Sequence, residues 1–237
     1  MALLLEGPMQ SWGIDSRFNR RATELFPSKS GIIGLLAAAM GVDKYVESES
    51  ADIQKLASLQ CKVFTMNTRS IQRMVDYHTV GGGYDDKDKL HHLRSADGKI
   101  KKDAALTYRY YLLDARFGAI LAGEGALLED AAAALQNPKW GLWLGRKCCI
   151  PSNPIFVALE EEEDSAWGKL LERTHAPSDK RTMDSYYYVE DIPSGTEQLD
   201  DETRNDLPVA YGAPIGERHT RRTIRKHIPV KSEDKQT

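Results

Sequence analysis

Two segments combine hydroxyl groups, cations and glycines in patterns that could bind phosphate. Residues 26–31 (FPSKSG) place two serines and a lysine just before an apolar helical pattern. Helix N-termini attract phosphate through the helix dipole and free N–H groups, although serines there also act as simple N-caps. Residues 144–148 (LGRKC) carry two cations after a glycine, which fits a phosphate clamp or an ordinary solvated loop. The candidate phosphate-binding residues are Ser28, Lys29, Ser30, Gly145, Arg146 and Lys147.

Two further segments carry aromatic rings next to polar groups. In residues 76–83 (DYHTVGGG), Tyr77 and His78 could stack on bases or act in acid–base chemistry, and the glycines allow close backbone approach. In residues 6–13 (EGPMQSWG), Gln10 and Trp12 follow a short apolar strand. This second segment fits either a base contact or a turn with a packed tryptophan.

Histidines and aspartates of residues 78–92 raise the question of a metal site. His78, His91 and His92 lie in the same segment as several aspartates, and imidazoles and carboxylates both bind divalent ions. Their irregular spacing favours a solvated hairpin instead. We therefore expect no metal and no cofactor.

Hydrophobic periodicity predicts the elements that must position these segments. Strands are expected at residues 3–6, 61–68, 107–121 and 154–159, and helices at about 30–40 and 125–136. Alternation in the third strand predicts one buried and one partly wet face. The order β-α-β-β-α-β predicts an α+β fold of the ferredoxin-like or RNA-recognition type.

The chain divides by composition into a main domain and smaller parts. Residues 1–160 form the predicted ferredoxin-like domain, with an insertion at about 69–106 that is too long for an ordinary turn. Residues 161–230 predict a small strand-containing lobe, and residues 231–237 a flexible tail. Charge is segregated in this lobe: residues 184–206 hold eight acids and one arginine, whereas residues 218–231 hold six Lys or Arg and no acid. Such a basic run is either a solvated face or a polyanion contact.

Overall composition excludes several classes of protein. The 237 residues are 41% hydrophobic and 28% charged, which is ordinary for a globular domain. The longest apolar stretch has twelve residues, residues 31–42, whereas a membrane span needs about 20. The N-terminus has no signal-peptide pattern, and three cysteines cannot form a disulfide framework. We expect a reduced cytoplasmic protein without a membrane partner.

Five motifs stand together in one order: GPMQSWG (7–13), FPSKSGIIGLL (26–36), DYHTV (76–80), YRYYLLDA (108–115) and LGRKC (144–148). In this order the chain resembles the CasD (Cas-five) family, a RAMP subunit of the type I-E CRISPR Cascade complex. The resemblance is strong over about residues 3–160 and general beyond them. It identifies the long insertion with the thumb of that family.

The resemblance implies a non-catalytic subunit that binds the 5′ handle of crRNA and caps the backbone filament in antiviral defence. It implies contacts with the Cascade backbone subunit, with the large subunit and, through the complex, with target DNA. Cations would bind phosphates, and aromatic rings would bind unstacked bases. The expected RNA-binding residues are Gln10, Trp12, Arg21, Ser28, Lys29, Ser30, Tyr77, His78, Arg109, Gly145, Arg146 and Lys147.

Two other functions remain open from the sequence. Relatives in type I-C systems cleave repeat RNA without metal, and Tyr77, His78 and Lys147 could supply a general base and a transition-state cation. The basic C-terminal run could instead bind an acidic protein partner, as in an adaptor. Salt-sensitive RNA binding would argue against the adaptor.

Overall fold

The computed structural model describes residues 1–13, 16–17, 19–46, 48–67, 70–81, 93–94, 98–101, 103–176, 182–213 and 217–229. Within these residues a large sheet has the strand order β11-β12-β10-β4-β8-β1-β9, and every neighbouring pair on this path is antiparallel. The path comprises β1 (Ala2–Gln10), β4 (Gln60–Thr65), β8 (Ala105–Ala122), β9 (Phe156–Ala158), β10 (Tyr188–Ile192), β11 (Glu202–Pro208) and β12 (His219–His227).

All four strands predicted for the main domain are present, but the first is longer than expected. Residues 7–10, expected as a loop, continue β1, because Gly7, Met9 and Gln10 pair with β8. Proline lacks an N–H, so Pro8 adds no ladder donor at this point. β8 carries the opposing irregularity, since Asp114 adopts a left-handed conformation with φ of 47°.

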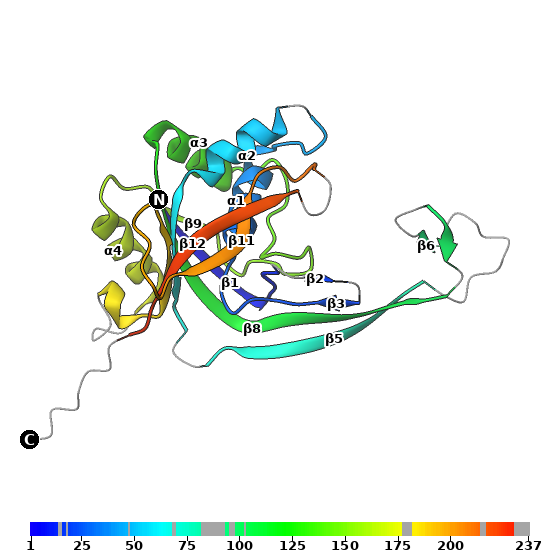
Figure 1. Cartoon of the computed structure of the whole chain (residues 1–237). Coiled ribbons are helices and arrows are strands. Elements are labelled where there is room, and N and C mark those ends of the chain that lie inside the picture. The colour runs from blue at the N-terminus through cyan, green and yellow to red at the C-terminus, as the bar shows by residue number, and fades with distance from the viewer. Residues whose placement is uncertain are drawn as a thin grey trace, which may run out of the picture.

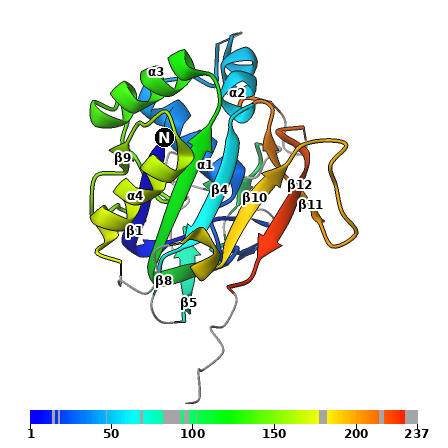
Figure 2. The same cartoon turned by 90° about the vertical axis from the view of Figure 1, so that its left-hand side faces the viewer.

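Helices cover both faces of the sheet (Figures 1 and 2). On one face lie the two predicted helices, α1 (Lys29–Met40) and α3 (Gly125–Gln136), together with α2 (Glu49–Ala57). The other face packs against α4 (Glu163–Thr174), and a short helical turn, η1 (Met183–Ser185), follows. Alternation along β1 divides the core, because Leu3 and Leu5 pack with α1 whereas Ala2 and Leu4 pack with α4.

Strands of the predicted C-terminal lobe extend the main sheet. β10 pairs with β4 through Tyr188 opposite Phe64, and β12 and β11 follow outside it. This segment therefore shares a continuous hydrogen-bonded sheet with the first half of the chain. Residues 230–237, which include the predicted tail, lie outside the described residues.

The predicted insertion contributes a long antiparallel ribbon. β5 (Gln72–Val80) pairs with the first half of β8, and the two strands extend away from the helices (Figure 1). β3 (Arg20–Arg21) pairs with β2 (Ser16–Arg17) and, in parallel, with β8. β6 (Leu93–Arg94) and β7 (Ile100–Lys101) form a separate pair. Gly82, Gly83, His91 and His92 lie outside the described residues.

Among the described residues, no helix is both long and apolar enough to cross a membrane. The three cysteines are free: Cys61 and Cys149 are buried, and Cys148 is exposed.

Candidate nucleic-acid interface

The ribbon of β5 and β8 has two chemically different faces. Tyr77 lies opposite Tyr108 with ring centroids 5.2 Å apart, and Asp76 lies opposite Arg109. Because successive residues of a strand point to opposite faces, the tyrosines share one face and Asp76 and Arg109 share the other. We call these the aromatic face and the charged face. Tyr77 and Tyr108 are 53% and 41% exposed, so two large rings are accessible to a ligand.

The charged face also holds His78. Its Nε2 atom contacts the Asp76 carboxylate, and the two side chains are similarly exposed. Arg109 donates from Nε to Thr107 Oγ1 over 3.3 Å, which orients its guanidinium along the strand. This face therefore presents one carboxylate, one imidazole and one guanidinium.

The three residues of the metal-independent endoribonuclease hypothesis do not share one face of the ribbon. Tyr77 and His78 are consecutive in β5, so their side chains point in opposite directions. Lys147 comes from the loop after α3. A base and a transition-state cation must both reach the same reacting atoms, and this arrangement keeps the Tyr77 ring on the far side of the strand from His78.

A glycine fixes the loop that carries the two predicted cations. Gly145 has φ of 96°, and a Cβ atom at this position would lie 1.8 Å from the carbonyl oxygen of Ser11. Ser11 in turn donates its backbone N–H to the carbonyl of Leu144 over 3.0 Å. Only glycine permits both the conformation and the close approach. The GPMQSWG and LGRKC motifs therefore meet at this contact.

Arg146 joins the loop to the ribbon. Its guanidinium lies 4.8 Å from the ring centroid of Tyr111 and donates to the carbonyl of Tyr110 over 3.2 Å and to that of Arg21 over 2.7 Å. Two donors of the fork are thus used inside the protein, while its charge remains at a partly exposed position. Arg146 both positions neighbouring segments and contributes positive potential.

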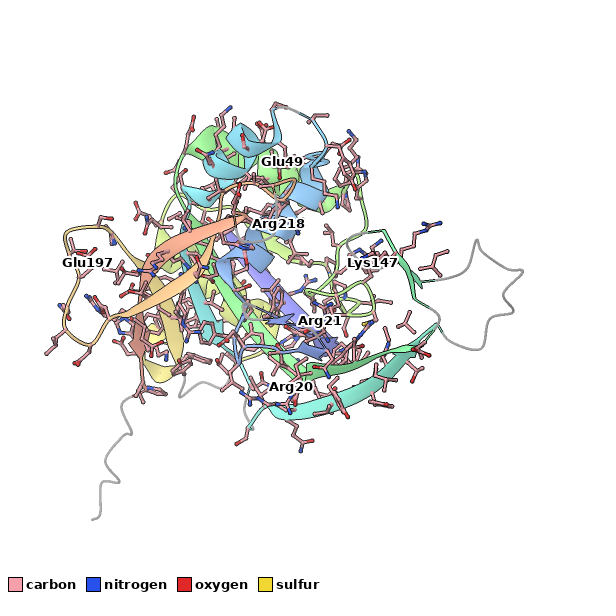
Figure 3. The ribbon with its side chains drawn as sticks, turned by 45° about the vertical axis from the view of Figure 1, so that its right-hand side comes forward. Arg20, Arg21, Glu49, Lys147, Glu197 and Arg218 are labelled. Atoms are coloured by element: carbon pink, nitrogen blue, oxygen red, sulfur yellow. The ribbon has the colours of Figure 1, made fainter. Side chains whose placement is uncertain are left out.

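Four cations from three segments converge on the charged side of the ribbon. β3 places Arg21 beside Arg109, and Figure 3 shows Arg21 and Lys147 on the same side of the ribbon. Within the described part of the chain, the side chains of Arg21 and Lys147 form no hydrogen bond or ion pair, and both residues are exposed. We call Arg21, Arg109, Arg146 and Lys147 the cationic surface. Such a surface can neutralise several phosphates of one strand.

Gln10 and Trp12 lie inside the protein rather than at this surface. Gln10 is 0% exposed, and its Nε2 donates to the carbonyls of Leu5 and Ala115 over 3.0 and 2.6 Å. Trp12 is 1% exposed and donates from Nε1 to Gln10 Oε1 over 2.9 Å. All polar atoms of the two side chains are paired, so the prediction that they contact RNA is replaced by a positioning role. A polar group buried without such partners would be costly.

The serines and lysine before α1 are also engaged internally. Ser28 is the N-cap and accepts a hydrogen bond from the N–H of Gly31 over 3.2 Å, and Ser30 Oγ lies 3.3 Å from Ser28 Oγ. Lys29 is 4% exposed. Of the two interpretations of this segment, capping is the one its contacts support, and none of the three residues joins the cationic surface.

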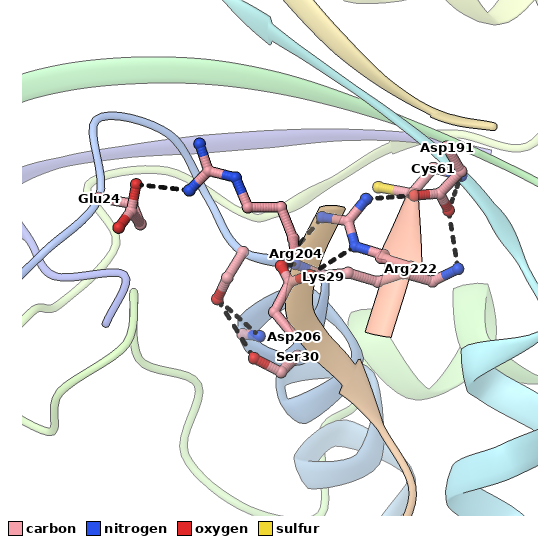
Figure 4. A network of polar contacts seen from close by, with 10 residues as sticks. Glu24, Lys29, Ser30, Cys61, Asp191, Arg204, Asp206 and Arg222 are labelled. Atoms are coloured by element: carbon pink, nitrogen blue, oxygen red, sulfur yellow. Dashed lines mark hydrogen bonds and ion pairs between the residues drawn. The ribbon is translucent and has the colours of Figure 1, made fainter. Parts of the chain in front are cut away.

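Lys29 belongs to a buried ion cluster that ties α1 to the C-terminal strands (Figure 4). Its Nζ donates to Asp191 over 2.7 Å, and its backbone N–H donates to Asp206 over 2.9 Å. Arg222 donates to both carboxylates. Burial lowers the pKa of the Arg222 guanidinium, but the hydrogen bonds with Asp206 and the charges of Asp206 and Asp191 together outweigh burial and raise it.

The segregated acidic and basic runs partly neutralise each other. β12 pairs with β10 and β11, and Arg225 donates to Asp201, Lys226 to Glu202, and His227 contacts Glu190. Three of the six Lys and Arg residues of the basic run, Arg222, Arg225 and Lys226, therefore have an acidic partner within this sheet. This part of the charge asymmetry marks an internal interface.

Residues 108–115 contribute a ring that was not among the predicted site residues. Tyr108 lies in the YRYYLLDA motif, where only Arg109 was predicted to bind RNA, and its ring packs against that of Tyr77 on the aromatic face. No group of three or more His, Cys, Asp or Glu that could hold a metal occurs among the described residues.

Comparisons with known proteins identify the family. The family model for CRISPR-associated protein (Cas_Cas5) matches residues 1–227. This chain belongs to the Cas5 family. The resemblance predicted from the five motifs is thus confirmed.

Individual Cas5 relatives agree with this assignment. The chain is 28% identical to the CRISPR system Cascade subunit CasD of Escherichia coli (strain K12), over 69% of this chain and 72% of that protein. A structure of a CRISPR RNA-guided surveillance complex contains a chain that superposes with a TM-score of 0.68 and 28% identity, over 97% of this chain and 89% of that one. A crystal structure of a Cas protein superposes with a TM-score of 0.60 and 27% identity, over 98% and 95%.

Proposed function

We propose that this Cas5 protein is a non-catalytic Cascade subunit that binds the 5′ handle of crRNA and caps the backbone filament. The observation that carries the proposal is the cationic surface, where three separate segments bring Arg21, Arg109, Arg146 and Lys147 to one side of a ribbon. Exposed tyrosines on the same ribbon can stack on unstacked bases. Membership of the Cas5 family and the likeness to a chain of an RNA-guided complex support it.

The proposed RNA contacts form a smaller set than the sequence predicted. Exposed or half-exposed residues stay in it, and buried residues with internal partners are assigned to positioning. The proposed contacts are Arg21, Tyr77, His78, Tyr108, Arg109, Gly145, Arg146 and Lys147.

We further assign two parts of the fold to the roles that the resemblance implies. Strand order β4-β8-β1-β9, with α1 and α3 on one face, supports a ferredoxin-like domain. The β5–β8 ribbon supports a thumb that lies against RNA next to the handle. In this proposal the protein acts in the cytoplasm, with the backbone and large subunits as neighbours, and it reaches target DNA through the complex.

Gel shifts of the full-length chain test this function. Labelled 5′-handle RNA is incubated with the protein in EDTA, and native and denaturing gels are run from the same tubes. We expect shifted, uncut RNA, with an affinity that falls as salt rises because bound counterions are released. Lys147→Ala and Arg109→Ala should each weaken binding about tenfold and reduce the salt slope by about 1.

Arg221→Ala is the matched control, because Arg221 is an exposed cation of β12 on a different part of the sheet. It should leave affinity nearly unchanged. Equal effects of all three variants would show that affinity depends only on net charge, and this result would contradict a specific RNA-binding surface. RNA cut at one position would overturn the non-catalytic role.

A further inference from the structure

A second feature next to the cationic surface is a pocket of about 580 Å³ beside α1. Gly34 and Ala38 lie along one side of this helix and form the floor. Neither has a side chain longer than a methyl group, so the helix backbone is open to a ligand of flat shape. The end of the pocket is lined by Gly145, which directly precedes two residues of the cationic surface.

Aromatic rings form the walls. Trp140 and Trp143 are 43% and 37% exposed, and Tyr45 and Tyr211 complete the lining. These rings are large, and their faces remain partly accessible. Monomeric proteins rarely expose such a concentration of aromatic surface without a binding partner.

Two walls are anchored to the protein before any ligand arrives. Trp140 donates its backbone N–H to the carbonyl of Ala38 over 3.3 Å. Tyr211 donates from its hydroxyl to the carbonyl of Ser30 and receives support from buried Glu49, which accepts the Tyr211 backbone N–H. The pocket is therefore built by contacts from α1, α2 and the chain before β12, and a ligand would not have to order it.

The lining chemistry suits a nucleobase. Aromatic faces stack on bases of any identity, and hydroxyl and carboxylate groups can bond base edges. Asp43 supplies a carboxylate, and Lys44 adds a cation at the same pocket. An apolar peptide would use the rings but would leave these polar groups without a function. Continuity with the cationic surface through Gly145 also favours the RNA strand over a protein segment.

We propose that this pocket holds one unstacked base of the RNA strand whose phosphates lie on the cationic surface. The inference rests on the proposed function, because the strand must first be bound there. It assigns a base-binding role to Trp140 and Trp143, residues that none of the five motifs includes.

A pocket-filling substitution provides the sharpest test. A Cβ atom at Gly34 would meet only the Tyr211 hydroxyl and ring carbon, at 3.5 and 3.8 Å, so Gly34→Phe can fill the pocket without displacing backbone. Gly168→Phe on α4 is the control, since nothing lies within 4 Å of its added Cβ. Thermal melting checks that both variants fold, and Trp143→Ala removes a wall by an independent route.

Binding is measured with a set of handle RNAs in which one base at a time is replaced by an abasic site. For the unmodified chain we expect one position whose loss weakens binding about tenfold. Gly34→Phe and Trp143→Ala should weaken binding of the intact RNA by a similar factor and lose the effect of that one abasic site. Gly168→Phe should behave as the unmodified chain does.

The outcomes separate this inference from the proposed function. If the unmodified chain binds RNA but no abasic site matters, or if Gly34→Phe keeps the same abasic profile, the base pocket is wrong and the RNA-binding function stands. If Gly34→Phe binds RNA normally but fails to co-purify with the other Cascade subunits, the pocket holds protein and the inference is overturned. If the unmodified chain does not bind the RNA, the proposed function itself fails.

Discussion

At the scale of single residues, burial separates side chains that position the loops from side chains that can meet a ligand. Gln10 and Lys147 were both predicted to contact RNA. Every side-chain polar atom of Gln10 is paired inside the protein, whereas Lys147 is exposed. A buried amide with three satisfied hydrogen bonds holds its neighbours in place. Gln10 therefore fixes the end of β1, and through its hydrogen bond with Trp12 it supports the packing beneath α1.

Replacing Gln10 by alanine should lower stability and spare RNA recognition. Gln10→Ala leaves the Trp12 Nε1–H without its acceptor and opens a cavity, so we expect the free energy of unfolding to fall by about 2–4 kcal/mol. Urea unfolding measures this loss, and gel shifts on the folded protein measure affinity. Unchanged stability with weakened RNA binding would return Gln10 to the contact set.

At the scale of elements, the N-terminus of α1 is held by strands from the far end of the chain. Lys29 reaches Asp191 of β10 and Asp206 of β11, and Arg222 of β12 bridges both carboxylates. This contact places α1 against the sheet and thereby sets the position of both the GPMQSWG segment and the pocket floor.

Removing one carboxylate from this cluster should be strongly destabilising. Asp191→Ala leaves the buried Lys29 ammonium without its carboxylate partner and Arg222 with Asp206 alone, and breaking a buried ion pair on one side costs about 3–5 kcal/mol. Thermal and urea unfolding provide the measurement. Glu172→Ala, which breaks the exposed pair with Lys169, is the control and should have a far smaller effect. Similar losses for both variants would contradict the structural role of the cluster.

At the scale of the whole molecule, ion pairs join the last three strands of the sheet. Hydrogen bonds with Arg225 lower the pKa of Asp201, and those with Lys226 lower the pKa of Glu202. Burial lowers the pKa of His219 below its ordinary value. In each case the folded state binds fewer protons than the unfolded state, so folding is favoured at higher pH.

Acid should therefore weaken the C-terminal strands in two steps. The contribution of His219 to the free energy of unfolding begins to fall as pH drops below about 6.5. The contributions of the two carboxylates begin to fall as pH drops below about 4. We expect hydrogen exchange in β11 and β12 to accelerate over both ranges before β1 and β8 are affected. Asp201→Asn should flatten the lower step, and a stability that rises on acidification would contradict the assignment.

The sequence by itself determined the elements of the main domain and the family. Periodicity located β1, β4, β8, β9, α1 and α3 to within a few residues, because each buries a regular face. α2 and α4 were missed, since their short apolar stripes lie among many charged residues. Five ordered motifs identified the Cas5 family, and several of their residues serve packing, as the contact of Gly145 with Ser11 shows.

Only the tertiary structure decided which polar residues face outward. Serines, glutamines and lysines of the motifs have similar local sequence context, and burial depends on strands that pair across more than a hundred residues, as Gln10 does with Ala115. The basic run likewise allowed two interpretations, a solvated face or a polyanion contact, and the pairing of β10, β11 and β12 places three of its cations against acids instead. Charges that attract one another across a sheet cancel there, and a linear charge pattern contains no record of that pairing.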